Sequence, residues 1–234
     1  MTDLSTRERL KLSARRLFAR SGIDGVSVRD IVLSAGQKNA ASLHYYFGTK
    51  ERLVRELVAD GAKLIDERRN RWIDELEARG RPIALRQIIE ALVWPSTALA
   101  GAQGEEDTYL RFIAMMQMSH RDLFLDSLEG KWASGYQRCL DHIRALLPGL
   151  TEEVLNQRLV FMSFYLTGTL SGREAALAGT HAAHRFWSAD WTLHNFVDTV
   201  EGLLRQRPSA ATARALEKAG VGRQRKRRAG GVPA

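Results

Sequence analysis

Polar side chains able to form hydrogen bonds with nucleic acid gather between residues 27 and 50. The stretch SVRDIVLSAGQKNAASLHYYFGTK interleaves hydroxyl, amide, imidazole, phenol and cationic groups with apolar positions. Arg and Lys bind phosphates or guanine edges, whereas Ser, Asn and Tyr bind base edges and phosphate oxygens. The chemistry that this set favours is therefore noncovalent binding in a DNA groove.

Two short helices joined by a tight turn would position these groups. Ser27 and Asp30 form a Ser-x-x-Asp pattern that caps a helix start, and Gly36 follows the last apolar position of that helix. A second helix is predicted from Ala41 to about Phe47. Three- and four-residue spacing places on its buried side Leu43, Tyr46 and Phe47.

A helix-turn-helix places base-reading groups at the start of its second helix and phosphate ligands around it. Lys38 and Asn39 stand at that start, and Arg29 can reach a phosphate or a guanine edge. The candidate DNA-binding residues are Ser27, Arg29, Lys38, Asn39, Ala40, Ser42, His44, Tyr45, Thr49 and Lys50. Of these, the phosphate ligands are expected at the far end of the second helix, at Tyr45, Thr49 and Lys50. Periodicity alone leaves open an ordinary helical hairpin with a solvated polar face.

An ordered set of motifs in the first quarter of the chain resembles the TetR/AcrR family of transcriptional regulators. These motifs are Arg16-Leu17-Phe18, Gly22, the run Gly25 to Ile31, Ala35-Gly36 and the run Tyr45 to Leu53. The resemblance implies a three-helix DNA-binding domain, an all-helical ligand-binding and dimerisation domain, and usually repression. His44 stands where the family often has tyrosine, and the turn from Gly36 to Ala41 is one residue longer than the commonest spacing.

The charge distribution favours a polyanionic partner at one end of the molecule only. The 234 residues carry a net charge of +8; residues 1–60 hold 11 Lys and Arg against 7 Asp and Glu, and residues 205–234 hold 9 against 1. The middle is acidic. We expect a DNA-binding domain over 1–52, a helical effector-binding and dimerisation domain over 53–206, and a disordered basic tail over 207–234. The tail would either add sequence-independent DNA affinity or serve solubility.

Outside this region the sequence contains little that could support catalysis or hold a metal. The six histidines are scattered, and there is no zinc motif, no glycine-rich phosphate loop and no nucleophile elbow. We therefore predict no catalysis, no metal and no cofactor. Cys139 is the only cysteine and is expected to be a small buried hydrophobe. No secretion signal or membrane-spanning run is found, which predicts a soluble cytoplasmic protein.

The predicted fold class is all-α. Apolar periodicity and capping residues predict helices over about 6–21, 49–79, 83–100, 107–118, 121–147, 151–178 and 189–205, with a loop over 180–188. Pro95 should kink the helix that contains it. Because no Gly-rich linker separates the two domains, the helix over 49–79 is expected to connect them.

Kinked buried helices and Met-aromatic stripes can line adaptable apolar cavities. On this basis the candidate effector-binding residues are Trp94, Tyr109, Phe112, Met115, Met116 and Tyr165. Plain core packing is the alternative for all of them.

The last two long helices are more apolar than one small core requires. Gly168 and Gly172 stand four residues apart, which would allow a neighbouring helix to approach closely. A two-fold four-helix bundle would cover the candidate dimer-interface residues Phe161, Phe164, Gly168, Gly172, Trp191, Phe196 and Val200. The resemblance implies the same mode of dimerisation, whereas packing within one protomer is the alternative.

Together these observations predict a homodimeric repressor that a small, mainly apolar effector releases from a palindromic DNA operator. Two alternatives keep the same fold: an effector-independent DNA-binding factor, and a transcriptional activator. A third is a small-molecule enzyme with a vestigial helix-turn-helix, against which the missing nucleophile-base constellation argues.

Overall fold

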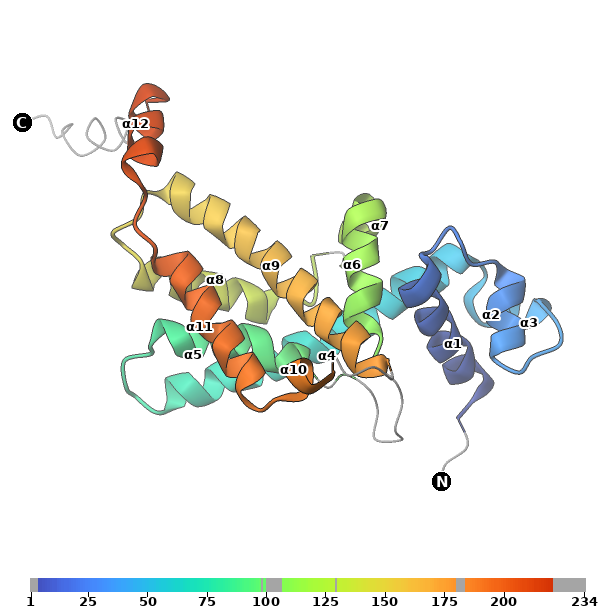
Figure 1. Cartoon of the computed structure of the whole chain (residues 1–234). Helices are drawn as coiled ribbons and strands as arrows, with labels where there is room; N and C mark the ends of the chain where they lie inside the picture. Colours follow the sequence, from blue (N-terminus) through green and yellow to red (C-terminus); the bar gives the residue numbers. More distant parts are fainter. Residues whose placement is uncertain (1–3, 98, 100–106, 129, 180–183, 221–234) are drawn as a thin grey trace, which may run out of the picture.

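The longest helix, α4 (Lys50–Ala78), runs from a small N-terminal group of helices into a larger helical body (Figure 1). The structure, a computed structural model, describes residues 4–97, 99, 107–128, 130–179 and 184–220. Within these ranges every regular element is a helix, which confirms the predicted all-α class. The division expected after residue 52 falls in the first turn of α4, so this helix connects the two parts without a break, as predicted.

The N-terminal unit consists of α1 (Thr6–Ser21), α2 (Val28–Ser34) and α3 (Ala41–Phe47), packed on the start of α4. Side chains from all four helices are buried together; the most central are Phe18, Ile31, Leu43, Phe47 and Leu53. Burial of apolar surface is worth about 25 cal/mol per Å². This small core therefore holds the angle between α2 and α3.

The body is built along the remainder of α4. Its helices are α5 (Leu85–Val93), α6 (Tyr109–Ser119), α7 (Arg121–Leu128), α8 (Ser134–Leu146), α9 (Glu152–Ala178), α10 (His184–Ser188) and α11 (Trp191–Arg205). Helix α4 packs against α5, α7 and α8, whereas α9 packs against α6 and α11. One apolar cluster extends from the N-terminal unit through the body.

Pro95 ends α5 early, and a buried arginine compensates for the missing donor. Instead of continuing to residue 100 as predicted, the chain passes into a 3₁₀ turn, η1 (Trp94–Ser96). Proline has no N–H, so the carbonyl of Ala91, four residues earlier, loses its helical partner. The guanidinium of Arg69 on α4 supplies one: its Nε donates to Ala91 O at 3.2 Å, and another nitrogen donates to Ser96 Oγ at 3.3 Å.

A buried carboxylate on α4, one turn before Arg69, caps the start of α8. Asp66 accepts hydrogen bonds from Gly135 N and from Ser134 Oγ, both at 2.8 Å. Gly135 also lies so close to α4 that an added Cβ would stand 3.1 Å from the Cβ of Arg69. Asp66 and Arg69 therefore fix the ends of two different helices against α4.

Two predicted boundaries in the body are wrong. The helix expected over 121–147 is interrupted between α7 and α8, where Gly130 and Trp132 both have positive φ angles, 67° and 56°. Such a backbone cannot continue an α-helix. The loop expected over 180–188 contains α10 from His184 onward, while residues 180–183 lie outside the described ranges.

The disordered tail expected over 207–234 is also corrected in part. Residues Ala210–Lys218 form α12, which projects from the end of the molecule opposite to the N-terminal unit (Figure 1). Its sequence is rich in alanine, the best helix former, and Ser209 caps it by accepting a hydrogen bond from Thr212 N. Residues 221–234 lie outside the described part of the chain.

Replacing Arg69 with Met should lower the free energy of unfolding by about 1–3 kcal/mol, because the carbonyl of Ala91 would be buried without a donor. Arg71→Met is the matched control, since Arg71 is exposed on the same helix. Urea unfolding at one fixed protein concentration measures both variants. Equal stability of the two variants would contradict the capping role of Arg69.

Candidate nucleic-acid interface

The start of α2 is held by the capping box that the sequence predicts. Ser27 Oγ accepts from Asp30 N at 3.2 Å, and the Asp30 carboxylate accepts from Ser27 N at 2.8 Å. The hydrogen bond from the Ser27 hydroxyl, followed by the one from its backbone, lowers the pKa of the Asp30 carboxyl. Arg29 is thereby placed, exposed, in the first turn of α2.

Two glycines with positive φ delimit the turn and the second helix. Gly36 (φ 71°) ends α2 and Gly48 (φ 72°) ends α3, a backbone region that glycine enters without a steric penalty. Between them, Asn39 Oδ1 accepts from Ala41 N at 2.8 Å and so caps α3. Thr49 Oγ1 accepts from Arg52 N at 3.1 Å and starts α4. The helix-turn-helix is therefore closed by local hydrogen bonds at each end.

The outward side of α3 and its entry carry most of the predicted DNA-binding residues. Tyr45 is 83% exposed, and Ser42 is half-buried. The other exposed candidates are Ser27, Arg29, Lys38, Asn39, Ala40, His44 and Thr49. Leu43 and Phe47 are buried as predicted, but Tyr46 is 39% exposed, with its ring edge-on to that of Tyr45. A seven-residue helix buries a narrow stripe, and Tyr46 falls at its margin.

Several candidate residues already form hydrogen bonds within the protein. Ser27, Asn39 and Thr49 cap helices, as described, and His44 Nδ1 donates to Gly48 O at 2.7 Å. These side chains shape the helix-turn-helix in the absence of DNA. All four residues are exposed, as is Tyr45.

Lys50 has a different environment from the one expected of a phosphate ligand. Its ammonium donates to Ile23 O and to Val26 O, both at 2.6 Å, and lies 5.8 Å from the centre of the Phe18 ring. These contacts tie the loop between α1 and α2 to the start of α4. We therefore propose that Lys50 positions this loop in place of contacting a phosphate.

Two cations of α1 are paired with carboxylates of α4. Arg7 and Lys11 both contact Glu56, and Lys11 Nζ lies 2.7 Å from Asp60 Oδ2. These pairs hold α1 along α4. The positive charge that faces outward on the helix-turn-helix comes instead from Arg29 and Lys38.

The six predicted effector-binding residues lie in several different surroundings. Tyr109, Phe112 and Met116 are packed in the core, where Phe112 stacks on Phe18 at 5.9 Å between ring centres. Met115 is 40% exposed. The other two pack elsewhere, Trp94 against His194 and Tyr165 against Phe196.

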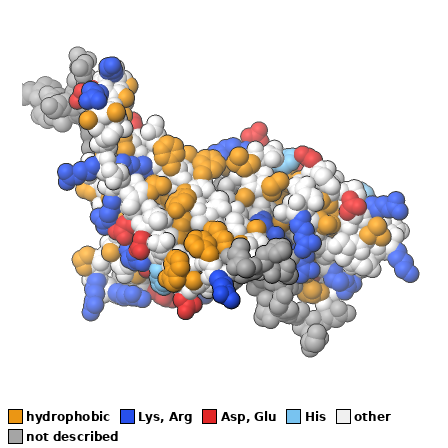
Figure 2. All heavy atoms as spheres, viewed as in Figure 1, with side chains coloured by type: hydrophobic (Ala, Val, Ile, Leu, Met, Phe, Trp, Pro, Cys, Tyr) orange, Lys and Arg blue, Asp and Glu red, His pale blue; other side chains and the backbone are white. Residues whose placement is uncertain are grey.

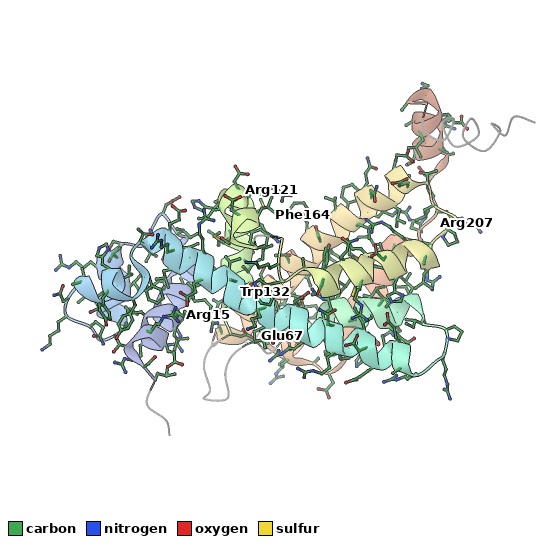
Figure 3. The ribbon with its side chains drawn as sticks, turned by 180° about the vertical axis from the view of Figure 1, so that it is seen from behind. Arg15, Glu67, Arg121, Trp132, Phe164 and Arg207 are labelled. Atoms are coloured by element: carbon green, nitrogen blue, oxygen red, sulfur yellow. The ribbon has the colours of Figure 1, made fainter. Side chains whose placement is uncertain are left out.

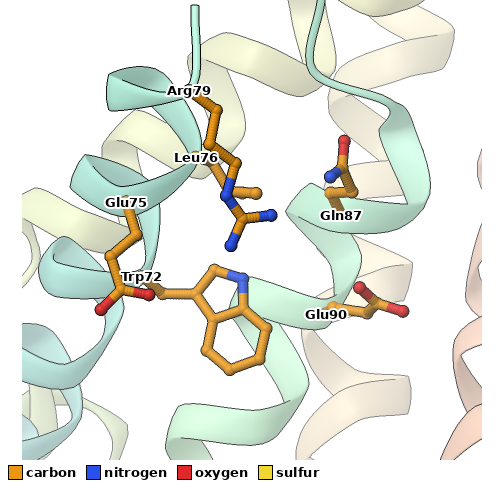
Figure 4. Close-up of a pocket in the computed structure, with 6 residues that line it drawn as sticks. All are labelled: Trp72, Glu75, Leu76, Arg79, Gln87 and Glu90. Carbon is orange, nitrogen blue, oxygen red and sulfur yellow. The ribbon is translucent and has the colours of Figure 1, made fainter. Parts of the chain in front are cut away.

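A hollow of about 150 Å³ lies between α4 and α5. Figure 4 shows its lining, with the Arg79 guanidinium next to the Trp72 indole. Its lining residues are Trp72, Glu75, Leu76, Arg79, Gln87 and Glu90, none of which the sequence singled out. Pockets for drug-sized ligands measure about 300–1,000 Å³, so this hollow fits only a much smaller molecule.

The predicted dimer face divides into an exposed and a buried part. Phe161, Phe164 and Trp191 are 59%, 47% and 56% exposed. A Cβ at Gly168 or Gly172 would meet nothing within 4 Å. Phe196 and Val200 are instead buried within the protomer, because they lie on the face of α11 that packs against α5 and α9.

Further exposed apolar side chains extend this surface. They are Val160 and Tyr165 on α9, and Phe186 on α10. Figure 2 shows hydrophobic side chains gathered along α9 and around α10 and α11. We call Val160, Phe161, Phe164, Tyr165, Phe186 and Trp191 the apolar face.

A polar junction between the N-terminal unit and the body was not expected from the sequence. Arg15 lies where α1 meets the body (Figure 3), and its Nε donates to Thr108 Oγ1 at 3.0 Å. Glu174 on α9 accepts from two backbone N–H groups of α6. Neither pairing could be read from the sequence, since the partners are 93 and about 64 residues apart.

The described residues contain no helix that combines the length and apolar character needed to cross a membrane. In the same part of the chain, no three His, Cys, Asp or Glu side chains are grouped as a metal site would require. Cys139 is fully buried, as expected, and burial raises the pKa of its thiol to about 11.

An exposed α3 on a capped helix-turn-helix, joined through α4 to a helical body, defines a DNA-binding transcription regulator. Comparison with known families places it more closely. The family described as "Bacterial regulatory proteins, tetR family" matches residues 12–57, and the family described as "Tetracyclin repressor-like, C-terminal domain" matches residues 90–202. The chain therefore belongs to the TetR family of transcription regulators.

Two solved structures resemble this chain. A putative tetR family transcription regulator from Shewanella sp. PV-4 is 15% identical in sequence, with a TM-score of 0.57 over 86% of this chain and 96% of that one, and it agrees on the fold. The TetR family transcriptional regulator PfmR from Thermus thermophilus is 17% identical, with a TM-score of 0.43 over 86% of this chain and 100% of that one. No curated protein matches the sequence.

Replacing Lys50 with Met should weaken DNA binding but leave its salt dependence unchanged, because the ammonium positions the α1–α2 loop and releases no counterions from DNA. Arg29→Ala is the comparison, and the slope of log K against log salt should fall by about 1. Fluorescence anisotropy over a salt series measures both slopes. A lower slope for the Lys50 variant would restore the phosphate contact.

Proposed function

We propose that this protein is a homodimeric repressor that places one α3 helix from each protomer in successive major grooves of a palindromic operator. The observation that carries the proposal is the outward face of α3, with Tyr45 83% exposed and Arg29 and Lys38 beside it. Such a face, held by caps at both ends, suits base and phosphate contacts. The two DNA half-sites bound by such a two-fold dimer would lie about 34–36 Å apart, or a multiple of that distance.

The apolar face supports the dimer. It presents five aromatic rings to solvent, and contiguous apolar patches on soluble monomers are usually small. The open surface at Gly168 and Gly172 leaves room for a helix of a second copy to approach α9. A four-helix arrangement of α9 and α11 from two protomers would remove this surface from water.

An effector that binds the off-operator conformation more tightly would shift the population away from DNA. Met and aromatic side chains in the body can repack around a small apolar molecule. The close packing of Tyr109, Phe112 and Met116 favours a second candidate, an effector-independent DNA-binding factor. Thermal unfolding with a panel of apolar ligands separates the two, since only a ligand that binds the native state raises Tm.

Selection of bound sequences from random duplex DNA with the full chain tests the main proposal. The expected product is an inverted repeat with one fixed spacing between its halves. Products without a shared motif, or a motif without two-fold symmetry, would refute the palindromic operator.

Phe161→Glu combined with Phe164→Glu should convert the dimer into monomers, because two charges would be buried without partners in the interface. Operator affinity should fall by about 100-fold or more as the two half-sites are no longer bound together. Leu125→Glu is the control, since Leu125 is 49% exposed on α7, outside the apolar face. Sedimentation measures the oligomeric state, and a variant that remains dimeric would move the interface elsewhere.

A further inference from the structure

Helix α6 stands between the DNA-binding unit and the body and contacts both. It packs against α1 on one side and against α9 on the other. The aromatic stack of Phe18 on Phe112 joins α1 to α6, and the Tyr109 hydroxyl donates to Val58 O of α4 at 2.9 Å. The DNA-binding unit is therefore attached to the body through α6 as well as through the continuous α4.

Glu174 of α9 caps the N-terminus of α6. Its two carboxylate oxygens accept from Leu110 N at 2.9 Å and from Arg111 N at 2.8 Å. These are N–H groups of the first helical turn, which have no partners within the helix. A carboxylate is also favourable beside the positive end of the helix dipole. The cap therefore joins α6 to the same helix that carries much of the apolar face.

Thr108, the residue before α6, continues this junction to the DNA-binding unit. Its side chain is fully buried, and Oγ1 accepts from Arg15 Nε of α1 at 3.0 Å. At the other end of α6, His120 Nε2 lies 3.2 Å from Asp24 Oδ2 in the loop between α1 and α2. Both ends of α6 are thus fixed to the unit that carries α3.

A buried carboxylate is a costly way to fasten two helices. Glu174 is only 6% exposed, and its burial raises the pKa of the carboxyl, although the two backbone hydrogen bonds act in the opposite direction. Well-packed apolar residues often stabilise a fold as much as a buried ionic group or more. Its hydrogen bonds, however, are directional, and an apolar contact would let α6 slide or rotate on α9.

We propose that Glu174 and Thr108 are positioning residues for DNA recognition: they fix the N-terminus of α6 between α9 and α1 and so set the angle of the DNA-binding unit to the dimer-forming helices. The inference rests on the proposed homodimer, in which this angle decides the distance between the two α3 helices. The junction acts on the spacing between half-sites, whereas residues on α3 act on the sequence of each half-site.

Glu174→Gln tests the junction with little change in volume. The amide keeps one acceptor but turns its second oxygen into a donor, which cannot pair with a backbone N–H. Thr108→Val removes the acceptor for Arg15 at nearly constant shape, and it provides an independent test if the Gln variant does not fold. Glu153→Gln is the matched control, because Glu153 is exposed on the same helix as Glu174.

Affinities are measured for the selected operator, for the operator with two base pairs inserted between its halves, and for a duplex with a single half-site. For Glu174→Gln and Thr108→Val, the preference for the native spacing should fall by about fivefold or more, a typical coupling between sites. Single-half-site affinity should stay within about twofold of the wild-type value by the same reasoning. The Glu153→Gln control should match the wild type in all three.

Unchanged spacing preference in folded Glu174→Gln and Thr108→Val would overturn the inference, as would equal losses on the full operator and on the single half-site. A wild-type protein without any spacing preference would instead refute the proposed homodimeric function, and the positioning role with it. A failure of the positioning role is therefore seen in the variants, whereas a failure of the homodimeric function is seen in the wild type.

A second readout needs no DNA. A nitroxide label is attached to the Ser34→Cys variant, at an exposed position of α2. Double electron–electron resonance then measures the distance between the two DNA-binding units of the dimer. Native Cys139 is fully buried and its thiol has a pKa of about 11, so it should stay unlabelled. Glu174→Gln should broaden the distance distribution, and an unchanged width would count against a positioning role.

Discussion

Several helices of the body have an end in the protein interior, where water cannot satisfy the free backbone groups, and α5, α6 and α8 are three of them. Each of these three ends is capped by a charged side chain from a different helix: Arg69 serves the end of α5, Asp66 the start of α8, and Glu174 the start of α6. Burying these charges is costly unless they are fully hydrogen-bonded. The arrangement of the body around α4 therefore depends on a few directional bonds as well as on apolar packing.

In the DNA-binding unit, the free backbone groups at helix ends lie at the surface and are capped by side chains close to them in sequence. Ser27, Asn39 and Thr49 cap helices within three residues of themselves, so the helix-turn-helix is shaped before any DNA is bound. Rigid presentation of Tyr45 and its neighbours lowers the entropy cost of binding. Lys50 adds hydrogen bonds between residues further apart in sequence, because its ammonium holds the loop that precedes α2.

Packing within the protomer leaves one apolar surface exposed to solvent. Helices α9 and α11 each bury one side in the body, whereas Phe161, Phe164 and Trp191 of the apolar face stay exposed. The same helix α9 carries Glu174 on its inner side and the apolar face on its outer side. A change in how α9 packs would therefore reach α6 through one cap, and α6 contacts the DNA-binding unit directly.

The sequence by itself determined the all-α class, the capping box of Ser27 and Asp30, the stop at Gly36, the continuous α4 and the buried Cys139, because these depend on residues within one or two helical turns. Only the tertiary structure decided the roles of Lys50, Arg69 and Glu174, whose partners are 27, 22 and 64 residues away. It also decided that Phe196 and Val200 face inward and that Tyr109 and Phe112 pack together. The interruption of the predicted long helix between α7 and α8 was likewise decided by the tertiary structure. Periodicity identifies an apolar side chain as one to be buried, but it cannot say whether its own protomer, a second copy or a ligand will cover it.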